Sequence, residues 1–442
     1  MRSGTGGTPS KIARYGNRVF NQANLIEDFS RTRATTERLA SPLRAEDQVV
    51  QSMPDASPVK WHLAHTTWFF ETFLLIPFLP GWRRYDDRWG YLFNSYYEAV
   101  GARHPRAQRG LLTRPSVQEV ARYRKAVDAA MAELLEAPGE SADEVTSLTR
   151  LGINHEQQHQ ELLLTDILHA FSCNPLRPAY HKPPAAEHHP QPTRPNWLSY
   201  PSGLREIGSD GTDGFVFDNE GPRHTVFLRP FRLADRLVSN AEWCDFIDDD
   251  GYRRAALWLS DGWAAVQAEN WRAPLYWQEN GSGAWQTMTL SGMQPVDLAA
   301  PVCHVGFYEA DAFARWAGKR LPSEAEWEFA TRDLPVSGNL LDEMHPVDSP
   351  LRPLAPMDEG PGLRQAFGDV WEWTQSAYAP YPGFRPAAGA VGEYNGKFMC
   401  NQMVLRGGSC ATPAGHVRAT YRNFFYPQQR WQFSGLRLAE DV

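Results

Sequence analysis

Residues 154–164 read NHEQQHQELLL and contain two histidines four residues apart, His155 and His159. On a helix this spacing brings the two side chains to one face, about 6 Å apart, where both can reach one metal ion. An exposed polar pair is the ordinary alternative. The same face also carries three leucines, which predicts that it points into a helical core: Leu148, Leu151 and Leu162. Two unpaired imidazoles in an apolar core are costly, so we favour a metal site.

A third ligand is expected from residues 61–71, WHLAHTTWFFE, which offer His62 and His65. Positions i and i+3 lie on nearly the same helix face, so spacing does not choose between them. Glu156 and Glu161 fall outside the histidine stripe, and no carboxylate is expected to join the site. Three histidines without a carboxylate suit Zn²⁺ and Fe²⁺ about equally.

The first half of the chain is predicted to be helical. Helices are expected near 23–50, over 58–76, from Val117 and over 145–171. The third helix opens with SVQE, a capping box beginning at Ser116. These segments predict a four-helix bundle over residues 21–173, preceded by a flexible N-terminus over residues 1–20.

A connector is predicted over residues 174–201, which contain eight prolines and no helical or strand periodicity. The second domain, residues 202–442, has many short strand-like segments and few helices. Capping boxes begin at Ser239 and Ser323, and a helical stretch ends on Gly318, a residue suited to a helix C-terminus. This pattern predicts an α+β domain.

Composition excludes several classes of partner. The net charge of −8 disfavours nucleic acid and anionic membranes. The five cysteines form no CxxC pair, and the N-terminus lacks an apolar signal core, so we expect a soluble cytoplasmic protein. The most apolar run, residues 69–82, contains Glu71 and two prolines and is too short to span a bilayer. Oligomeric state is not readable from the sequence.

Several longer motifs resemble a known enzyme family. Three of them resemble the DinB-like bundle of the sulfoxide synthases of ergothioneine biosynthesis: SPVKWHLAHTTWFFE (57–71), LFNSYYEAVGARHPRAQRG (92–110) and NHEQQHQELLL. Four more resemble the formylglycine-generating-enzyme-like (sulfatase-modifying-factor-like) domain, which has a C-type-lectin-like fold: KRLPSEAEWEFATR (319–332), FGDVWEWTQS (367–376), VLRGGS (404–409) and TYRNFFYPQQRWQFSGLRLA (420–439). The resemblance spans about residues 20–442.

The resemblance implies a mononuclear non-haem iron(II) enzyme. Such enzymes use O₂ to join the sulfur of a thiol to C2 of the imidazole of hercynine (N-α-trimethylhistidine), giving a sulfoxide. The metal ligands carried over are His65, His155 and His159. His62 falls where relatives need no histidine, so the resemblance leaves it a packing or ligand-supporting role.

The resemblance also implies roles for residues around the metal. Tyr96 and Tyr97 would deliver a proton at the iron, without a choice between them; core packing is the ordinary alternative. An arginine pair would hold the carboxylate of the thiol, whereas surface arginines are usually solvated. The other carried-over residues position hercynine or face its trimethylammonium group. The residues expected to bind the thiol are Arg106 and Arg109, and those expected to bind hercynine are Gln158, Asn423, Phe424 and Phe425.

Two departures from the family pattern are informative. Relatives that use γ-glutamylcysteine carry an Asp and an Arg where this chain has Phe425 and Gln429, so free L-cysteine is the expected sulfur donor. Formylglycine-generating enzymes bind copper through a cysteine pair, but the corresponding segment here has only Cys410, so that chemistry is not expected.

Four alternatives remain open at the level of sequence. The thiol could be γ-glutamylcysteine, or the product could be of the ovothiol type, a 5-histidylcysteine sulfoxide. A zinc-dependent DinB-like thiol transferase and a non-enzymatic C-type-lectin-like binding protein belong to other classes.

Overall fold

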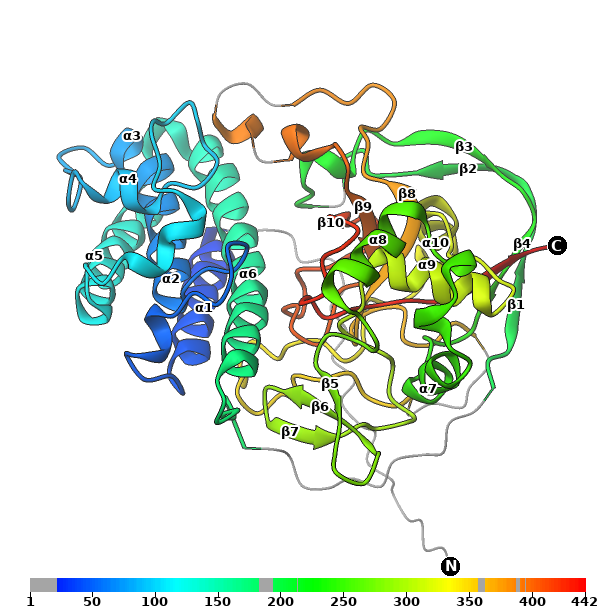
Figure 1. Cartoon of the computed structure of the whole chain (residues 1–442). Helices are drawn as coiled ribbons and strands as arrows, with labels where there is room; N and C mark the ends of the chain where they lie inside the picture. Colours follow the sequence, from blue (N-terminus) through cyan, green and yellow to red (C-terminus); the bar gives the residue numbers. More distant parts are fainter. Residues whose placement is uncertain (1–21, 183–193, 213, 357–361, 387–389, 394) are drawn as a thin grey trace, which may run out of the picture.

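Figure 1 shows the computed structural model of the chain, which describes residues 22–182, 194–212, 214–356, 362–386, 390–393 and 395–442. A helical part is followed by a part of mixed helices and strands, and the two lie side by side. The predicted combination of a helical bundle and an α+β domain is therefore confirmed. The predicted flexible N-terminus, residues 1–20, lies outside the described residues.

Four long helices build the first part: α1 (Gln22–Ala40), α2 (Val59–Phe70), α5 (Val117–Glu136) and α6 (Ala142–Cys173). Helix α6 packs on α1 and α2, and α2 also packs on α5. The short helices α3 (Ile76–Phe78) and α4 (Trp89–Phe93) follow α2. The first predicted helix, 23–50, ends at Ala40 instead, because Pro42 follows shortly and disfavours helical geometry in the residue before it. Helix α5 begins at the predicted capping box of Ser116 and Glu119.

Helix α6 is buried on both sides, which corrects the prediction of one inward stripe. Gln157 and Gln160 are buried. Glu156 lies inside the bundle, where its carboxylate accepts hydrogen bonds from Arg33 and Arg124. The opposite side of α6 is covered by the second domain (Figure 1), which a helical periodicity alone does not reveal.

The second part contains helices α7 to α10 and four small sheets. The helices are α7 (Asn240–Asp248), α8 (Ser260–Glu269), α9 (Phe307–Trp316) and α10 (Glu324–Thr331). One sheet has the order β10-β9-β8-β11, from β8 (Trp371–Ala377), β9 (Met403–Arg406), β10 (Asn423–Phe425) and β11 (Ser434–Gly435). The predicted capping boxes at Ser239 and Ser323 are present, and Gly318 follows α9 with a φ of +66°.

The remaining sheets have two or three strands each. Their orders are β1-β4-β12, β2-β3 and β5-β6-β7. The strands are β1 (Trp197–Tyr200), β2 (Gly203–Ile207), β3 (His224–Leu228), β4 (Phe231–Ala234), β5 (Trp277–Glu279), β6 (Trp285–Thr289), β7 (Gly292–Pro295) and β12 (Ala439–Asp441).

Strand β1 corrects the predicted connector, residues 174–201. Its four residues pair antiparallel with β4, so they belong to the second domain. β1 is an edge strand of its sheet, a position that tolerates the prolines on either side of it, Pro195 and Pro201. Across the described residues, every helix is either too short or too polar to cross a lipid bilayer.

Candidate active site

Three histidines from two helices converge at the centre of the bundle. His65 comes from α2, and His155 and His159 come from α6. One ring nitrogen from each lies within 4.8 Å of the others. The Nε2 atoms of His65 and His155 are 3.2 Å apart. The structure thus brings together the three residues predicted as ligands.

The hydrogen bonds of His65 fix which of its nitrogens carries a lone pair. Its Nδ1 lies 2.6 Å from the carbonyl oxygen of Phe93, which can only accept, so Nδ1 carries the proton. Its Nε2 therefore presents a lone pair to His155. The ring is stacked between Trp61 and Trp68, with centroid distances of 4.5 and 5.6 Å, which holds its orientation.

His62 supports this cluster from outside it. Its Nδ1 lies 2.9 Å from Nδ1 of His159, and its Nε2 lies 3.1 Å from Oδ2 of Asp166. The same carboxylate oxygen accepts a hydrogen bond from the backbone N–H of Ser57. Because the carboxylate accepts, His62 donates from Nε2 and can accept at Nδ1 from His159, which leaves Nε2 of His159 as a lone-pair donor.

Burial keeps the imidazoles of His65, His155 and His159 neutral. It lowers the pKa of His155 to about 3. The pKa values of His65 and His159 are also well below the usual value, because of burial and then the neighbouring positive charges. Neutral imidazole is the form that binds metal ions.

The donor set fits a divalent metal ion. Its nitrogens lie within 4.8 Å of one another, and two of them already face each other at 3.2 Å, so a rearrangement of the side chains would bring all three to one ion. The nearby carboxylate of Glu156 does not join the cluster, because it is engaged by Arg33 and Arg124. Burial raises the pKa of Glu156, but the charges of these two arginines lower it to about 2.

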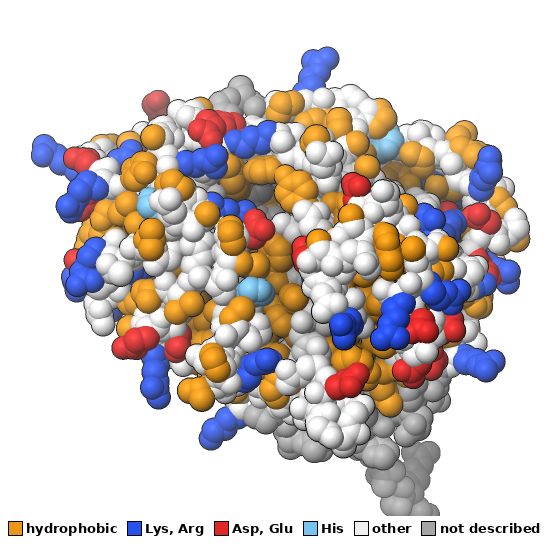
Figure 2. Space-filling model, in the orientation of Figure 1, with side chains coloured by type: hydrophobic (Ala, Val, Ile, Leu, Met, Phe, Trp, Pro, Cys, Tyr) orange, Lys and Arg blue, Asp and Glu red, His pale blue; other side chains and the backbone are white. Residues whose placement is uncertain are grey.

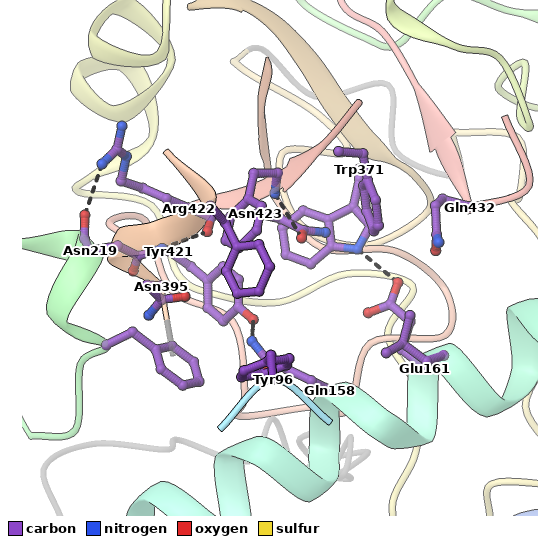
Figure 3. A pocket seen from close by; sticks show the side chains of 15 residues that line it. Tyr96, Gln158, Glu161, Asn219, Trp371, Asn395, Tyr421, Arg422, Asn423 and Gln432 are labelled. Atoms are coloured by element: carbon purple, nitrogen blue, oxygen red, sulfur yellow. Dashed lines mark hydrogen bonds between the residues drawn. The ribbon is translucent and has the colours of Figure 1, made fainter. Parts of the chain in front are cut away.

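A cavity of about 180 Å³ lies between α6 and the second domain. Figure 3 shows its labelled side chains, with Gln158 and Glu161 reaching up from α6. The Nε2 atom of Gln158 donates to the hydroxyl of Tyr421 at 2.6 Å. On the opposite wall, β8 and β10 supply Trp371 and residues 423–425.

The predicted hercynine-binding residues all line this cavity. Asn423, Phe424 and Phe425 form strand β10, and Gln158 faces them from α6. Phe424 stacks on Tyr378 with a centroid distance of 4.0 Å, so part of its ring is used in packing. Gln429 accepts a hydrogen bond from the backbone N–H of Tyr426.

The two predicted tyrosines occupy different positions. Tyr96 lines the cavity, whereas Tyr97 is buried against Trp68 and Phe73. Their ring centroids are 4.9 Å apart. Burial, followed by the charge and hydrogen bond of Tyr96, raises the pKa of Tyr97 well above its usual value.

The two predicted arginines differ in burial and in their hydrogen-bond partners. Arg109 is buried, and its guanidinium carbon lies 3.4 Å from the centre of the Trp61 ring. It donates hydrogen bonds to the hydroxyls of Ser57 and Ser95. Arg106 is exposed and donates to the backbone carbonyl of Asp55, and burial first and then the charge of Arg106 lower the pKa of Arg109.

Residues that the sequence analysis missed also line the cavity. Glu161 is one of them. Its Oε1 accepts hydrogen bonds from Nε1 of Trp371 and from the hydroxyl of Ser409, and its Oε2 accepts from Thr412. This carboxylate ties α6 to the second domain. The other missed residues are Phe217, Asn219, Asn395, Phe398, Tyr421, Arg422 and Gln432. Tyr421 and Arg422 stand beside Asn423 in the quoted TYRN motif, the only signal that pointed to them.

On the face that Figure 2 shows, charged side chains of one sign do not gather in a patch. Lys, Arg, Asp and Glu side chains are scattered over both halves of that face.

Comparison with known proteins agrees with this two-part architecture. Residues 28–163 match the DinB superfamily, and residues 182–442 match the sulfatase-modifying factor enzyme 1-like domain. The formylglycine-generating enzyme of Streptomyces coelicolor is 29% identical over 282 residues, covering 52% of this chain and 83% of that protein.

Two relatives match almost the whole chain. The hercynine oxygenase of Mycobacterium tuberculosis is 34% identical, covering 94% of this chain and 98% of that protein. The hercynine oxygenase of Mycolicibacterium smegmatis is also 34% identical, covering 96% of this chain and 100% of that protein. The resemblance found in the sequence is thereby confirmed, and the chain belongs to the hercynine oxygenase family of oxidoreductases.

Proposed function

We propose that this chain is a non-haem iron(II), O₂-dependent sulfoxide synthase that joins L-cysteine to C2 of the hercynine imidazole. In the overall reaction, hercynine C2–H, the cysteine S–H and O₂ give the C–S bond, the sulfoxide oxygen and one water. The observation that carries the proposal is the cluster of three buried, neutral histidines without a carboxylate, beside an aromatic cavity.

His65, His155 and His159 would hold the metal ion. Ferrous iron bound by three neutral ligands would supply open coordination positions and electrons for reaction with O₂. The neutral donor set leaves the ion its full charge, which favours an anionic thiolate substrate. Hydrogen bonds from His65 to Phe93 and through His62 to Asp166 orient two of the three donors.

Hercynine would occupy the cavity between α6 and β10. Its trimethylammonium group has no hydrogen-bond donor and suits an aromatic face, and Phe424 and Phe425 offer such faces. Gln158 and Asn423 supply polar atoms on opposite walls.

Arg109 would hold the carboxylate of the thiol substrate. In the part of the chain that the structure describes, Arg109 donates to two serine hydroxyls but has no carboxylate within salt-bridge distance, and its buried Nε has no partner. A buried cation of this kind is costly without an anion. Phe425 and Gln429 offer no charge for a glutamyl group, which supports L-cysteine over γ-glutamylcysteine.

Tyr96 and Tyr97 would supply the proton that oxygen reduction requires. Tyr96 lines the cavity, and its ring centroid lies 4.9 Å from that of Tyr97. Burial raises the pKa of Tyr97 well above its usual value, so this phenol stays protonated at neutral pH and can donate without competing as a ligand. We place the reaction in the cytoplasm, because all five cysteines are free thiols.

The test is anaerobic loading with Fe²⁺, followed by O₂, hercynine and L-cysteine. We expect O₂ consumption and a product with the mass of hercynine plus cysteine plus one oxygen, less two hydrogens, that has lost the imidazole C2 proton. Loss of the C5 proton would indicate the ovothiol-type product. A higher kcat/KM with γ-glutamylcysteine would overturn the assignment of the thiol, and no O₂ consumption by the iron-loaded protein would overturn the oxidative function.

A further inference from the structure

The loop that carries the two tyrosines, residues 94–101, follows helix α4 in the helical part, but its backbone is also bound by the second domain. The carboxylate of Glu393 accepts hydrogen bonds from two successive N–H groups of this loop, that of Glu98 at 3.1 Å and that of Ala99 at 2.9 Å. Each N–H uses a different carboxylate oxygen. Figure 1 shows the segment that contains Glu393, drawn in orange, extending from the second domain toward the helical part.

Lys397, four residues after Glu393, binds the same loop from its other side. Its ammonium donates to the backbone carbonyl of Tyr96 and lies 2.9 Å from Oε2 of Glu393. It also lies 5.5 Å from the centre of the Tyr96 ring, within cation–π range. We call these two residues the Glu393–Lys397 clamp. It offers an acceptor to the loop N–H groups and a donor to the loop carbonyl, so exchanging its two charges would leave both backbone contacts unmatched.

The contacts of the clamp with the loop matter more than its own ion pair. The side chains of Lys397 and Glu393 are 34% and 22% exposed, and a partly exposed ion pair by itself adds little to stability. The hydrogen bond from Lys397 first, and then that from Ala99, lower the pKa of Glu393, so its carboxylate is charged at neutral pH. Hydrogen bonds to charged groups are roughly twice as strong as those between neutral groups.

The loop brings Tyr96 to the cavity. The ring of Tyr96 lines it beside Phe398 of the second domain, at a centroid distance of 5.2 Å. Within the loop, the amide of Asn94 donates to the backbone carbonyls of Tyr97 and Gly101 at 3.2 and 2.9 Å. The loop is thus closed by its own asparagine, while the clamp sets its place against the second domain.

We propose that the Glu393–Lys397 clamp positions the two tyrosines: it fixes the backbone of their loop, so that their phenols stand at the cavity. Neither clamp residue lines the cavity, and each acts through the loop. The inference rests on the proposed function, in which these phenols supply a proton during O₂ reduction. L-cysteine and O₂ form cysteine sulfinic acid with no further proton, because the thiol hydrogen and both oxygen atoms are retained in it. A displaced loop should therefore shift the products from sulfoxide to sulfinate.

The test compares Glu393→Ala and Lys397→Ala with wild type in the iron-loaded full chain, supplied with hercynine, L-cysteine and O₂. We expect the ratio of sulfoxide to cysteine sulfinate, measured by mass spectrometry, to fall about tenfold, a part of the loss expected when a general acid is removed altogether. The iron content should match that of wild type. Hydrogen exchange at the amides of Glu98 and Ala99 should be faster in Glu393→Ala, which reports on the loop independently of catalysis.

Two further variants separate the clamp from its ion pair. Glu393→Lys combined with Lys397→Glu keeps two opposite charges but reverses them, so that an ammonium faces the loop N–H groups and a carboxylate faces the carbonyl. We expect this swapped variant to be as impaired as Glu393→Ala. Lys397→Arg keeps the charge and the donor, and it should retain most of the wild-type product ratio.

Asp311→Ala is the matched control. Asp311 forms an i,i+4 ion pair with Arg315 at 2.8 Å on α9, and neither residue lines the cavity. This variant should leave the product ratio unchanged. A wild-type ratio in the swapped variant would overturn the inference, as would faster amide exchange in Glu393→Ala without a change in products, or a loss of iron that accounts for the change. Wild-type protein that forms no sulfoxide would instead overturn the proposed function, and the exchange measurement would still show whether the clamp holds the loop.

Discussion

The Nδ1 atoms of His62 and His159 lie 2.9 Å apart, and the second nitrogen of His62 reaches the carboxylate of Asp166 at 3.1 Å. Each N–H in this chain points toward Asp166: Nδ1 of His159 donates to His62, and Nε2 of His62 donates to the carboxylate. The Nε2 atom of His159 therefore keeps its lone pair for a metal ion. His62 thus supports one of the proposed metal ligands, His159.

Asp166→Asn should weaken iron binding about 10- to 100-fold, because such supporting groups orient the ligand and raise its basicity. The measurement is a competitive titration of Fe²⁺ against a chelator. Asp235→Asn, at a buried aspartate of the second domain that pairs with Arg364, is the control and should bind iron like wild type. If Asp166→Asn and Asp235→Asn bound Fe²⁺ with equal affinity, Asp166 would have no supporting role at the metal site.

Arg109→Gln should raise the KM for L-cysteine about 10- to 100-fold, because a charge-assisted hydrogen bond of about 1.5–3 kcal/mol is lost. The KM for hercynine should change little. Arg106→Gln is the matched control, since this arginine is exposed and bonded to a backbone carbonyl. If Arg106→Gln were the more damaging change, the cysteine site would lie elsewhere.

Tyr96→Phe and Tyr97→Phe should each lower the rate of sulfoxide formation, and the double variant should lower it by about 10²-fold or more, the usual contribution of a general acid. Oxygen should then be diverted to simple thiol oxidation, detected as cysteine sulfinate by mass spectrometry. Because Tyr96 lines the cavity, its single variant should be the more severe. Unchanged product ratios in the double variant would exclude both phenols as the proton source.

The pH dependence of stability should carry a signature of His416. Its folded pKa is lowered to about 3 by burial, against 6.5 in the unfolded chain, so only the unfolded state binds a proton between these values. Its contribution to stability is therefore fully present above about pH 6.5 and is lost as the pH falls toward 3. Near pH 5, the free energy of unfolding should rise less steeply with pH in His416→Asn than in wild type, by about 1.4 kcal/mol per pH unit. Urea unfolding at several pH values measures this slope, and identical slopes would contradict a neutral buried His416.

The sequence predicted the parts of the site that local spacing controls. The i,i+4 spacing on α6 nominated His155 and His159, and the stretch in α2 nominated His62 or His65, between which only the family resemblance chose. The capping boxes located the starts of three helices. These features depend on contacts within a few residues along the chain.

The missing parts depend on how the domains pack. The second face of α6 is buried because the second domain covers it, so no partner was predicted for Glu161, which accepts hydrogen bonds from Trp371, Ser409 and Thr412. Arg109 is buried against Ser57 and Trp61, whereas Arg106 stays exposed on the Asp55 backbone carbonyl, a difference that their spacing did not reveal. Neither outcome could be read from periodicity.

Iron stoichiometry under anaerobic conditions tests the central claim most directly. Full-length protein titrated with Fe²⁺ should bind one ion per chain, and His65→Ala, His155→Ala and His159→Ala should each lose it. His104→Ala, at a histidine of the loop before Arg109, should keep it. Full iron binding by the three alanine variants, or none by wild type, would contradict a ferrous centre held by these residues.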